Sequence, residues 1–330
     1  MKKFFLSCIL FFIILVFIIP TTFGILKALD DLVEHINEPK NLPPHHLINY
    51  TRENIDAELL FKEQNELTYS PVPFMGFRSD PYQGKYYNID KLGQFTFRRS
   101  INQAMEADVW FFGGSTMEGA GSSDNTTIPS YFAKITGNKV INFGVSSYNS
   151  RQELDLMLNA ILHLKKPKQV VFYDGYNDIA HHCNSRLKLI PQYFRTEEYF
   201  SNYTKKLSGE IPEHNDNPLF YFVTYPYKYI YNRLQTKEQL NLKTNSPWLN
   251  DDYLKKVAKS IVEAWLTADS ILQKHGIEFT PVLQPNIFTS TSNKDHLQKL
   301  DDIEKDMYLK GYRYIKKYIS ETTLKRKILS

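Results

Sequence analysis

The stretch "FFGGSTMEGAGSS", residues 111–123, places two glycines and a serine directly after a run of large apolar residues. The run "ADVWFF" (107–112) is typical of a buried parallel strand. A glycine-rich turn at the end of such a strand lets the backbone come close to a ligand or to another segment. The turn around Ser115 is therefore the first candidate site.

Further apolar runs follow this strand, separated by helical patterns. The predicted strands are 139–144, 168–175 and 277–285, and the predicted helices are about 128–135, a helix opened by a capping box at Ser150-Arg151-Gln152-Glu153, 253–275 closed by Gly276, and about 297–325. This alternation predicts an α/β fold, with a parallel sheet and helices on both of its faces.

Three familiar glycine-rich devices do not fit the turn. A phosphate-binding P-loop requires a lysine where Ala120 stands, and a Gly-x-Gly-x-x-Gly dinucleotide fingerprint is absent from the sequence. The nucleophile elbow requires Gly-x-Ser-x-Gly, but Met117 occupies its last position. The turn therefore has to be interpreted from the ends of the neighbouring strands.

The ends of the first three predicted strands carry complementary chemistry. The first ends in Gly113-Gly114-Ser115-Thr116, the second in Gly144, and the third in Gly175-Tyr176-Asn177-Asp178. In a doubly wound sheet these ends open onto the same edge. A serine hydroxyl, a backbone N–H and a carboxamide would converge there, which is the equipment for acyl transfer.

The three blocks "FFGGSTMEGAG", "INFGVSSYNS" and "FYDGYND" resemble those of the SGNH (GDSL-like) hydrolase superfamily, over about residues 106–290. The resemblance implies a three-layer α/β/α sandwich with a flavodoxin-like sheet. It implies Ser115 as the nucleophile, with an oxyanion hole made by the backbone N–H groups of Ser115 and Gly144 and the side chain of Asn177. We expect no cofactor and no metal.

The general base does not follow the family pattern. The family has an Asp-x-x-His block after the last strand, whereas no histidine here follows His296, and Asn293 stands three residues before it. Asp178 and His181 have the spacing but lie beside the third block. His181, His182 and His296 stay open as bases, and so do a chain that stops short of the block and an inactive relative.

The N-terminus predicts a membrane segment. Residues 4–26 are uncharged and largely apolar, with lysines before them and acidic residues after them, which favours an uncleaved anchor (1–26) with its N-terminus inside. A cleaved signal peptide is the alternative, and the protein would then be secreted. Both interpretations place residues 27–330 outside the cytoplasm, in a periplasm or beyond.

The remaining chain divides into a juxtamembrane stalk and accessory segment (27–105) and a hydrolase domain (106–330) with an insertion at about 184–250. Short strands are expected in 69–100. The aromatic stripe at 217–234 predicts a helix packed on the core, or alternatively a lid or a bilayer contact. A net charge of +4 without a basic stripe argues against a nucleic-acid partner, and Cys8 and Cys183 cannot form a disulfide framework.

These expectations combine into one functional prediction, an anchored extracytoplasmic ester hydrolase. Its partners would be an acylated or acetylated glycan or lipid of the cell envelope and, through residues 4–26, the bilayer itself. An acyltransferase that acts on glycan hydroxyls and a catalytically inactive binding protein are the alternatives.

Overall fold

The computed structural model describes residues 4, 55–183, 250–290 and 302–328. From residue 55 onward these belong to one compact unit, formed by residues 47–204 and 246–330. The predicted anchor (apart from Phe4), the insertion up to residue 249 and His296 lie outside the described residues. Among the described helices, none combines the length and apolarity that a bilayer span requires.

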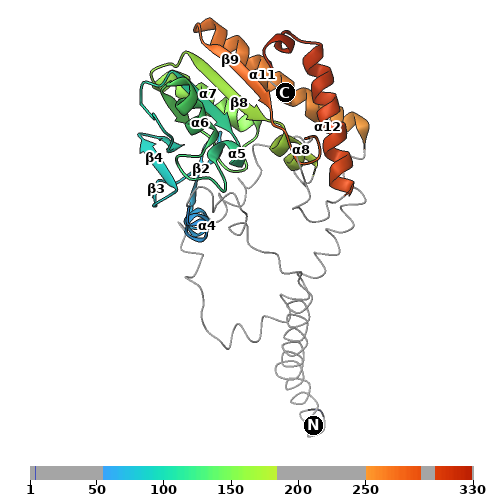
Figure 1. Cartoon of the computed structure of the whole chain (residues 1–330). Coiled ribbons are helices and arrows are strands. Elements are labelled where there is room, and N and C mark those ends of the chain that lie inside the picture. The colour runs from blue at the N-terminus through green and yellow to red at the C-terminus, as the bar shows by residue number, and fades with distance from the viewer. Residues whose placement is uncertain (1–3, 5–54, 184–249, 291–301, 329–330) are drawn as a thin grey trace. The chain divides into compact units, whose positions relative to one another are not determined.

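A seven-stranded sheet forms the centre of this unit, in the order β3-β4-β5-β7-β6-β8-β9 (Figure 1). The strands are β3 (Tyr82–Gln83), β4 (Asn88–Leu92), β5 (Phe95–Arg98), β6 (Val109–Gly113), β7 (Val140–Asn142), β8 (Gln169–Asp174) and β9 (Glu278–Leu283). The four predicted strands are β6 to β9, and they pair in parallel. Their spatial order, second-first-third-fourth along the chain, is that of a flavodoxin-like sheet.

The sheet is mixed rather than purely parallel, which corrects the sequence prediction. Strands β3, β4 and β5 pair antiparallel with one another, and β5 continues onto β7 through Arg98 and Asn142. The accessory segment therefore extends the main sheet, and the boundary predicted at residue 105 lies inside one continuous sheet. Only β1 (Tyr69–Val72) and β2 (Gly76–Ser79) form a separate hairpin among the described strands.

Helices cover both faces of the sheet, as the alternation predicted. The helices are α4 (Ala57–Asn65), α5 (Ser115–Glu118), α6 (Ile128–Thr136), α7 (Ser150–His163), α8 (Tyr176–Cys183), α11 (Asp251–Lys274) and α12 (Asp302–Ser320), with a short 3₁₀ helix at Thr323–Arg326. Trp110 and Phe112 of β6 pack with α7, α11 and α12, whereas Val109 and Phe111 pack with Ala133 of α6. Alternating side chains of a strand point to opposite faces, so these two clusters are the two layers of the core.

Helix α7 begins with a cap that differs from the predicted capping box. Asn149, not Ser150, is the N-cap, and its side chain accepts a hydrogen bond from Gln152 N at 3.2 Å. Glu153 is fully buried instead of reaching back to the cap. Asparagine is as good an N-cap as serine, so the core claims Glu153 without costing the helix its start.

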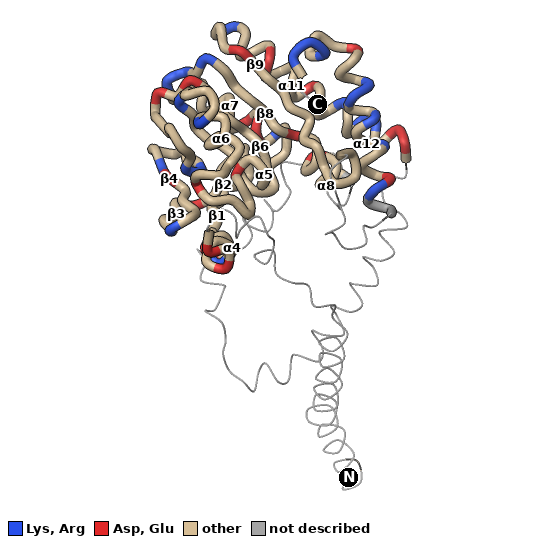
Figure 2. Tube along the Cα trace, in the orientation of Figure 1, with Lys and Arg blue, Asp and Glu red and all other residues tan. Residues whose placement is uncertain are grey.

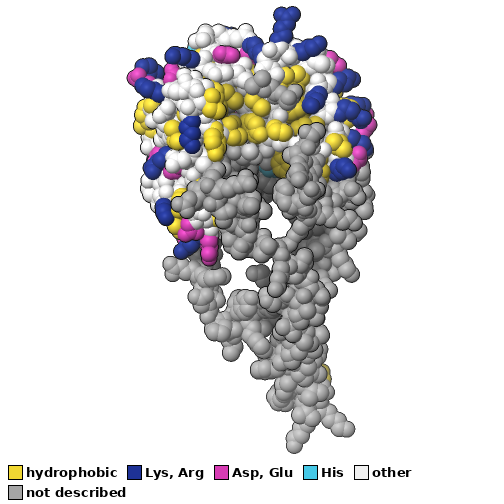
Figure 3. All heavy atoms as spheres, viewed as in Figure 1, with side chains coloured by type: hydrophobic (Ala, Val, Ile, Leu, Met, Phe, Trp, Pro, Cys, Tyr) yellow, Lys and Arg dark blue, Asp and Glu magenta, His cyan; other side chains and the backbone are white. Residues whose placement is uncertain are grey.

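The surface of the described residues mixes both signs of charge, with Lys and Arg interspersed among Asp and Glu (Figure 2). Hydrophobic side chains form a band across the face seen in Figure 3, where β8 and β9 lie toward the viewer in Figure 1. Tyr173 of β8 and Val282 of β9 are half-buried on the α6 side of the sheet, packed against the smaller core cluster. The outer edge of β9 pairs with no other strand of the described chain.

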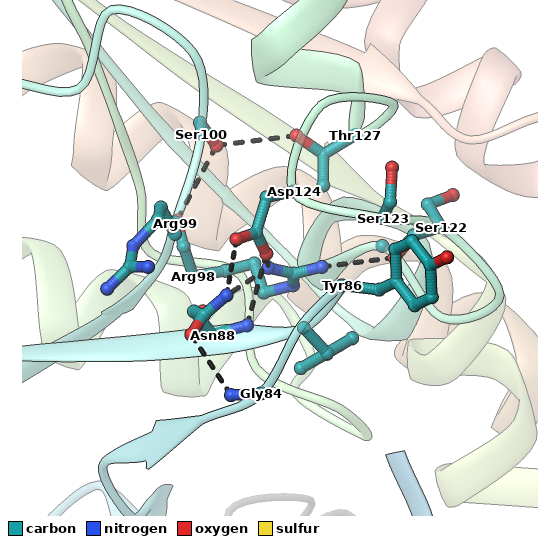
Figure 4. Close-up of polar contacts among 12 residues, drawn as sticks. Gly84, Tyr86, Asn88, Arg98, Arg99, Ser100, Ser122, Ser123, Asp124 and Thr127 are labelled. Carbon is teal, nitrogen blue, oxygen red and sulfur yellow. Dashed lines mark hydrogen bonds and ion pairs between the residues drawn. The ribbon is translucent and has the colours of Figure 1, made fainter. Parts of the chain in front are cut away.

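Arg98, at the end of β5, attaches the antiparallel strands to the loop between α5 and α6 (Figure 4). Its side chain is 0% exposed, it forms an ion pair with Asp124, and its Nη2 donates to Ser122 O at 3.0 Å. The guanidinium also lies 3.5 Å from the ring centroid of Tyr87. Asn88 Nδ2 donates to the second carboxylate oxygen of Asp124 at 2.6 Å. The charge of Arg98 is therefore compensated on several sides.

Removing the partner of Arg98 tests this attachment. We expect Asp124→Ala to lower the free energy of unfolding by about 3–5 kcal/mol, because the guanidinium is left buried without its counter-charge. Glu106→Ala breaks the exposed pair between Glu106 and Lys165 and is the control, with an expected change below about 1 kcal/mol. Denaturant titration measures both, and equal effects would contradict the role given to Arg98.

Candidate active site

Ser115 lies at the start of α5, where β6 ends. Gly114 is the N-cap of this short helix, and Ser115 is its first residue, half-buried at the sheet edge. The N–H groups in the first turn of a helix have no intrahelical acceptor, so the Ser115 amide is available to a ligand. Within the described residues, no hydrogen bond engages Ser115 Oγ. The hydroxyl and its own amide are thus both presented at the strand end.

Gly144 follows β7 but does not present its amide as predicted. The Gly144 N–H donates to Asn142 Oδ1 at 2.9 Å, and Asn142 Nδ2 donates to Met117 O at 2.8 Å. A Cβ on Gly144 would overlap the backbone of Glu118, so this glycine allows the strand end to pack on α5. Gly144 therefore has a packing role here, and its N–H is already engaged within the protein.

The residues after Gly144 form a tight turn that presents a different amide. Tyr148 N donates to Val145 O at 3.0 Å, which closes a four-residue turn. Ser147, its third residue, has φ +68°, the left-handed conformation of that position in a type II turn. No acceptor for the Ser147 N–H is found among the described residues. The sequence gave no sign of this donor, because such a position is usually glycine or asparagine.

Asn177, at the beginning of α8, joins these two strand ends. Its Nδ2 donates to Tyr148 O at 2.7 Å, and a Cβ on Gly114 would overlap the same Nδ2 and lie 3.2 Å from Tyr148 O. The carboxamide is therefore packed between the residue before Ser115 and the residue after Ser147. One of its two N–H bonds is used by Tyr148 O, and the second remains for a ligand.

Asp178 secures the end of β8 to the start of α7. Its carboxylate accepts from Ser150 N at 3.1 Å, from Ser150 Oγ at 2.5 Å and from Gly175 N at 3.2 Å. These three bonds explain a buried aspartate at this position without a partner histidine. The spacing of Asp178 and His181, noted in the sequence, is thus not needed to account for Asp178.

The histidines of α8 are both buried. His181 is 6% exposed and His182 is 3% exposed. Burial lowers the pKa of His182 to about 4, so this ring is uncharged at neutral pH. His181 lies four residues after Asn177, on the same side of the helix. Neither ring is shown in a hydrogen bond with Ser115, and the third candidate, His296, lies outside the described residues.

Three carboxyl groups lie together under this end of the sheet, on Glu153, Asp174 and Asp178. Asp174 Oδ2 accepts from the indole N–H of Trp265 at 2.7 Å. Burial raises the pKa of Glu153 well above its usual range, and the neighbouring Asp174 adds to the effect. Burial and the charge of Asp178 raise the pKa of Asp174 to about 7. Glu153 is therefore protonated at neutral pH, and Asp174 is close to its midpoint.

The described residues contain no group of three or more His, Cys, Asp or Glu side chains arranged to hold a metal ion. A hollow of about 470 Å³ lies elsewhere, between residues 85–86 and 123–126, and none of Ser115, Ser147 and Asn177 lines it. The candidate site is thus defined by its donors rather than by a deep cavity.

No protein-family model matches the chain, and no curated protein matches it. Solved structures overlap it in part. A G-D-S-L family protein described as lipolytic, from Desulfitobacterium hafniense DCB-2, shares 13% identity, with 62% of this chain and 98% of that chain covered and a TM-score of 0.25. A variant of the acetyl xylan esterase Axe2 from Geobacillus stearothermophilus shares 14%, over 67% and 75%, with a TM-score of 0.28.

A GDSL-like lipase from Bacteroides thetaiotaomicron VPI-5482 shares 18% identity, over 64% of this chain and 88% of that chain, with a TM-score of 0.23. These TM-scores are too low to carry an argument about function. The functional assignment therefore depends on the geometry of the strand ends.

The buried carboxyl groups predict a pH dependence of stability. The pKa of Asp174 is higher in the folded than in the unfolded chain, so its contribution is complete below about pH 4 and is lost as the pH rises through 7. We expect Asp174→Asn to flatten the fall in the free energy of unfolding between pH 4 and 8, because asparagine still accepts from Trp265. Asp252→Asn, on the exposed start of α11, is the control. Unfolding titrations across this range decide, and an unchanged slope in Asp174→Asn would refute the assignment.

Gly114→Ala tests the contact between the strand ends. The new methyl would overlap Asn177 Nδ2, so we expect a loss of stability of about 1–3 kcal/mol or a displaced carboxamide. Gly93→Ala is a weak control, because Gly93 has open space but a φ of +56°. Thermal unfolding measures the loss, and a fully stable Gly114→Ala variant with an unmoved Asn177 would contradict the geometry.

Proposed function

We propose that the chain is a serine ester hydrolase of the SGNH type. The observation that supports this is the arrangement of donors at the three strand ends. Ser115 presents a free hydroxyl and a free amide, Ser147 presents a free amide, and Asn177 lies between them with one N–H to spare. Donors fixed in advance around a nucleophile are what stabilises the oxyanion of an acyl-transfer intermediate.

In the proposed reaction, Ser115 Oγ attacks the ester carbonyl carbon while a base removes its proton. The carbonyl oxygen becomes an oxyanion that accepts from the Ser115 amide, the Ser147 amide and Asn177 Nδ2. Collapse of this intermediate breaks the bond to the alcohol, which leaves with a proton, and the acyl group stays on Ser115. Water then attacks the acyl-serine and releases the acid. Each fixed donor supplies a factor of about 10²–10³ in rate.

The substrate class in this proposal is an acyl or acetyl ester of an envelope glycan or lipid. It is supported by the apolar segment at residues 4–26, which predicts that the hydrolase domain is held at the outer side of a membrane. A small, shallow ester suits a site at the open edge of a sheet. Transfer of the acyl group to a glycan hydroxyl would use the same nucleophile and donors.

The base is the histidine that remains to be assigned, and two candidates are tested directly. His181 lies on the Asn177 side of α8, and His296 follows β9 in the sequence. We expect His296→Ala or His181→Ala to reduce kcat by about 10²-fold or more, because an unassisted serine is a poor nucleophile. If neither does so and the wild-type chain is inactive, a binding role without catalysis is favoured.

The nucleophile is tested with an activated acetyl ester and a fluorophosphonate probe. We expect ester hydrolysis by the wild-type chain, loss of activity in Ser115→Ala, and a single probe adduct on the peptide that contains Ser115. Ser122→Ala, in the next loop, is the matched control and should keep full activity. Probe attached to a different serine, or hydrolysis that survives Ser115→Ala, would overturn the proposed function.

Replacing Ser147 distinguishes its amide from its hydroxyl. In Ser147→Gly the backbone N–H remains and φ +68° becomes unstrained, so we expect kcat within about twofold of wild type and unchanged or higher stability. Asn177→Ala removes a side-chain donor, and kcat should fall by about 10²–10³-fold. Steady-state kinetics measures both. A large loss of kcat in Ser147→Gly would show that the hydroxyl, not the amide, acts at this position.

A further inference from the structure

Glu118 is the last residue of α5, three residues after Ser115, and its side chain is completely buried. Its carboxylate accepts three hydrogen bonds from two other segments. Ser79 Oγ, at the end of β2, donates to Oε1 at 2.9 Å. Ser146 donates to Oε2 with both its backbone N–H, at 2.9 Å, and its hydroxyl. One carboxylate therefore links α5, the β1–β2 hairpin and the turn at 145–148.

A buried carboxylate is costly unless it is fully hydrogen-bonded or paired with a positive charge. Burial raises the pKa of Glu118, while the bonds from Ser146 and Ser79 and the charge of Arg98 oppose that rise. The tyrosines near it are Tyr87 and Tyr148, both with pKa values raised by burial and so uncharged. The carboxylate is thus kept in place by its three donors, and a role in the fold has to justify it.

The consequence of these bonds lies in the next residue of the turn. Ser146 is fixed at its backbone N–H and its hydroxyl, and the turn is closed by the bond from Tyr148 N to Val145 O. The peptide unit between Ser146 and Ser147 therefore has little freedom to rotate. Its N–H belongs to Ser147, the residue held at φ +68°. The direction of the Ser147 N–H is set through Glu118.

We propose that Glu118 is a positioning residue that orients the Ser147 amide toward the oxyanion and couples the β1–β2 hairpin to the active site. This inference rests on the proposed function, since it assigns a role within the same site. Glu118 does not touch the reacting atoms. It acts through Ser146 on one side and is itself held by Ser79 on the other.

The chain offers a matched control in Glu63 of α4. Glu63 is 5% exposed, and its carboxylate also accepts three hydrogen bonds, from the backbone N–H groups of Lys85 at 2.7 Å, Tyr86 at 2.9 Å and Tyr87 at 3.0 Å. It secures a loop of the accessory strands and contacts none of the strand-end donors. Glu63→Ala and Glu118→Ala thus remove the same kind of interaction at two places.

The experiment compares kcat and KM for these variants of the full chain on an activated acetyl ester. We expect Glu118→Ala to lower kcat by about 30-fold or more with KM within about threefold, because a small displacement of a catalytic donor is expensive. Glu118→Gln should recover most of the loss, since its Oε1 can accept from Ser146 while its Nε2 donates to Ser79 Oγ. Glu63→Ala should keep kcat within about threefold.

Amide hydrogen exchange gives a second measurement that needs no activity. We expect faster exchange of residues 145–148 in Glu118→Ala than in Glu63→Ala, at a temperature where both are folded. Should Glu118→Ala fail to fold, Ser146→Ala replaces it, with an expected few-fold loss of kcat. Equal losses in the two glutamate variants, or unaltered exchange at 145–148, would overturn the inference. A wild-type chain without Ser115-dependent hydrolysis would instead contradict the proposed function, and the exchange comparison would still decide whether Glu118 holds the turn.

Discussion

The site depends on a close approach of backbone and side chain at Gly114, where no Cβ fits. This glycine lies against the carboxamide of Asn177 and the carbonyl of Tyr148, which come from two other strand ends. The contact brings the helix that carries Ser115 next to the turn that carries Ser147. A parallel sheet supplies the common edge, but it is this packing that places the donors around one point.

Buried polar groups connect this edge to the rest of the molecule. Arg98 ties the antiparallel strands to the loop after α5, and Glu118 ties the β1–β2 hairpin to the turn at 145–148. Asp178 joins the ends of β8 and α7. Such groups contribute little net stability, because desolvation offsets much of their attraction, but they tolerate few alternative arrangements. The accessory segment thereby becomes part of the active-site scaffold rather than a stalk beside it.

The sequence predicted the parallel strands and their helices because local hydrophobic periodicity carries that information. Their order, the clustering of the three strand ends and the position of Ser115 followed from the same reasoning. The pairing of β5 with β7 was missed, since it joins segments more than forty residues apart and leaves no local pattern. The capping box at Ser150 was wrong because burial beside Asp174 took Glu153, and Asn149 was available as a cap.

The oxyanion donors show the same limit at the scale of single residues. Gly144 was the obvious candidate because glycines mark close approaches, but the side chain of Asn142 already occupies its N–H. Ser147 was missed because its left-handed conformation arises from the turn closed by Tyr148 and held by Glu118, not from its own preference. Residue type shows where the backbone can come close, whereas the surrounding contacts decide which amide is free.

A crystal structure of the chain with a bound alkylphosphonate, a tetrahedral mimic of the acyl-transfer intermediate, tests the central claim most directly. The account predicts one phosphonate oxygen at about 2.7–3.1 Å from each of three atoms, Ser115 N, Ser147 N and Asn177 Nδ2, with Ser115 Oγ facing the phosphorus. A phosphonate bound elsewhere, or a Ser147 N–H directed at a protein acceptor while the site is occupied, would contradict it.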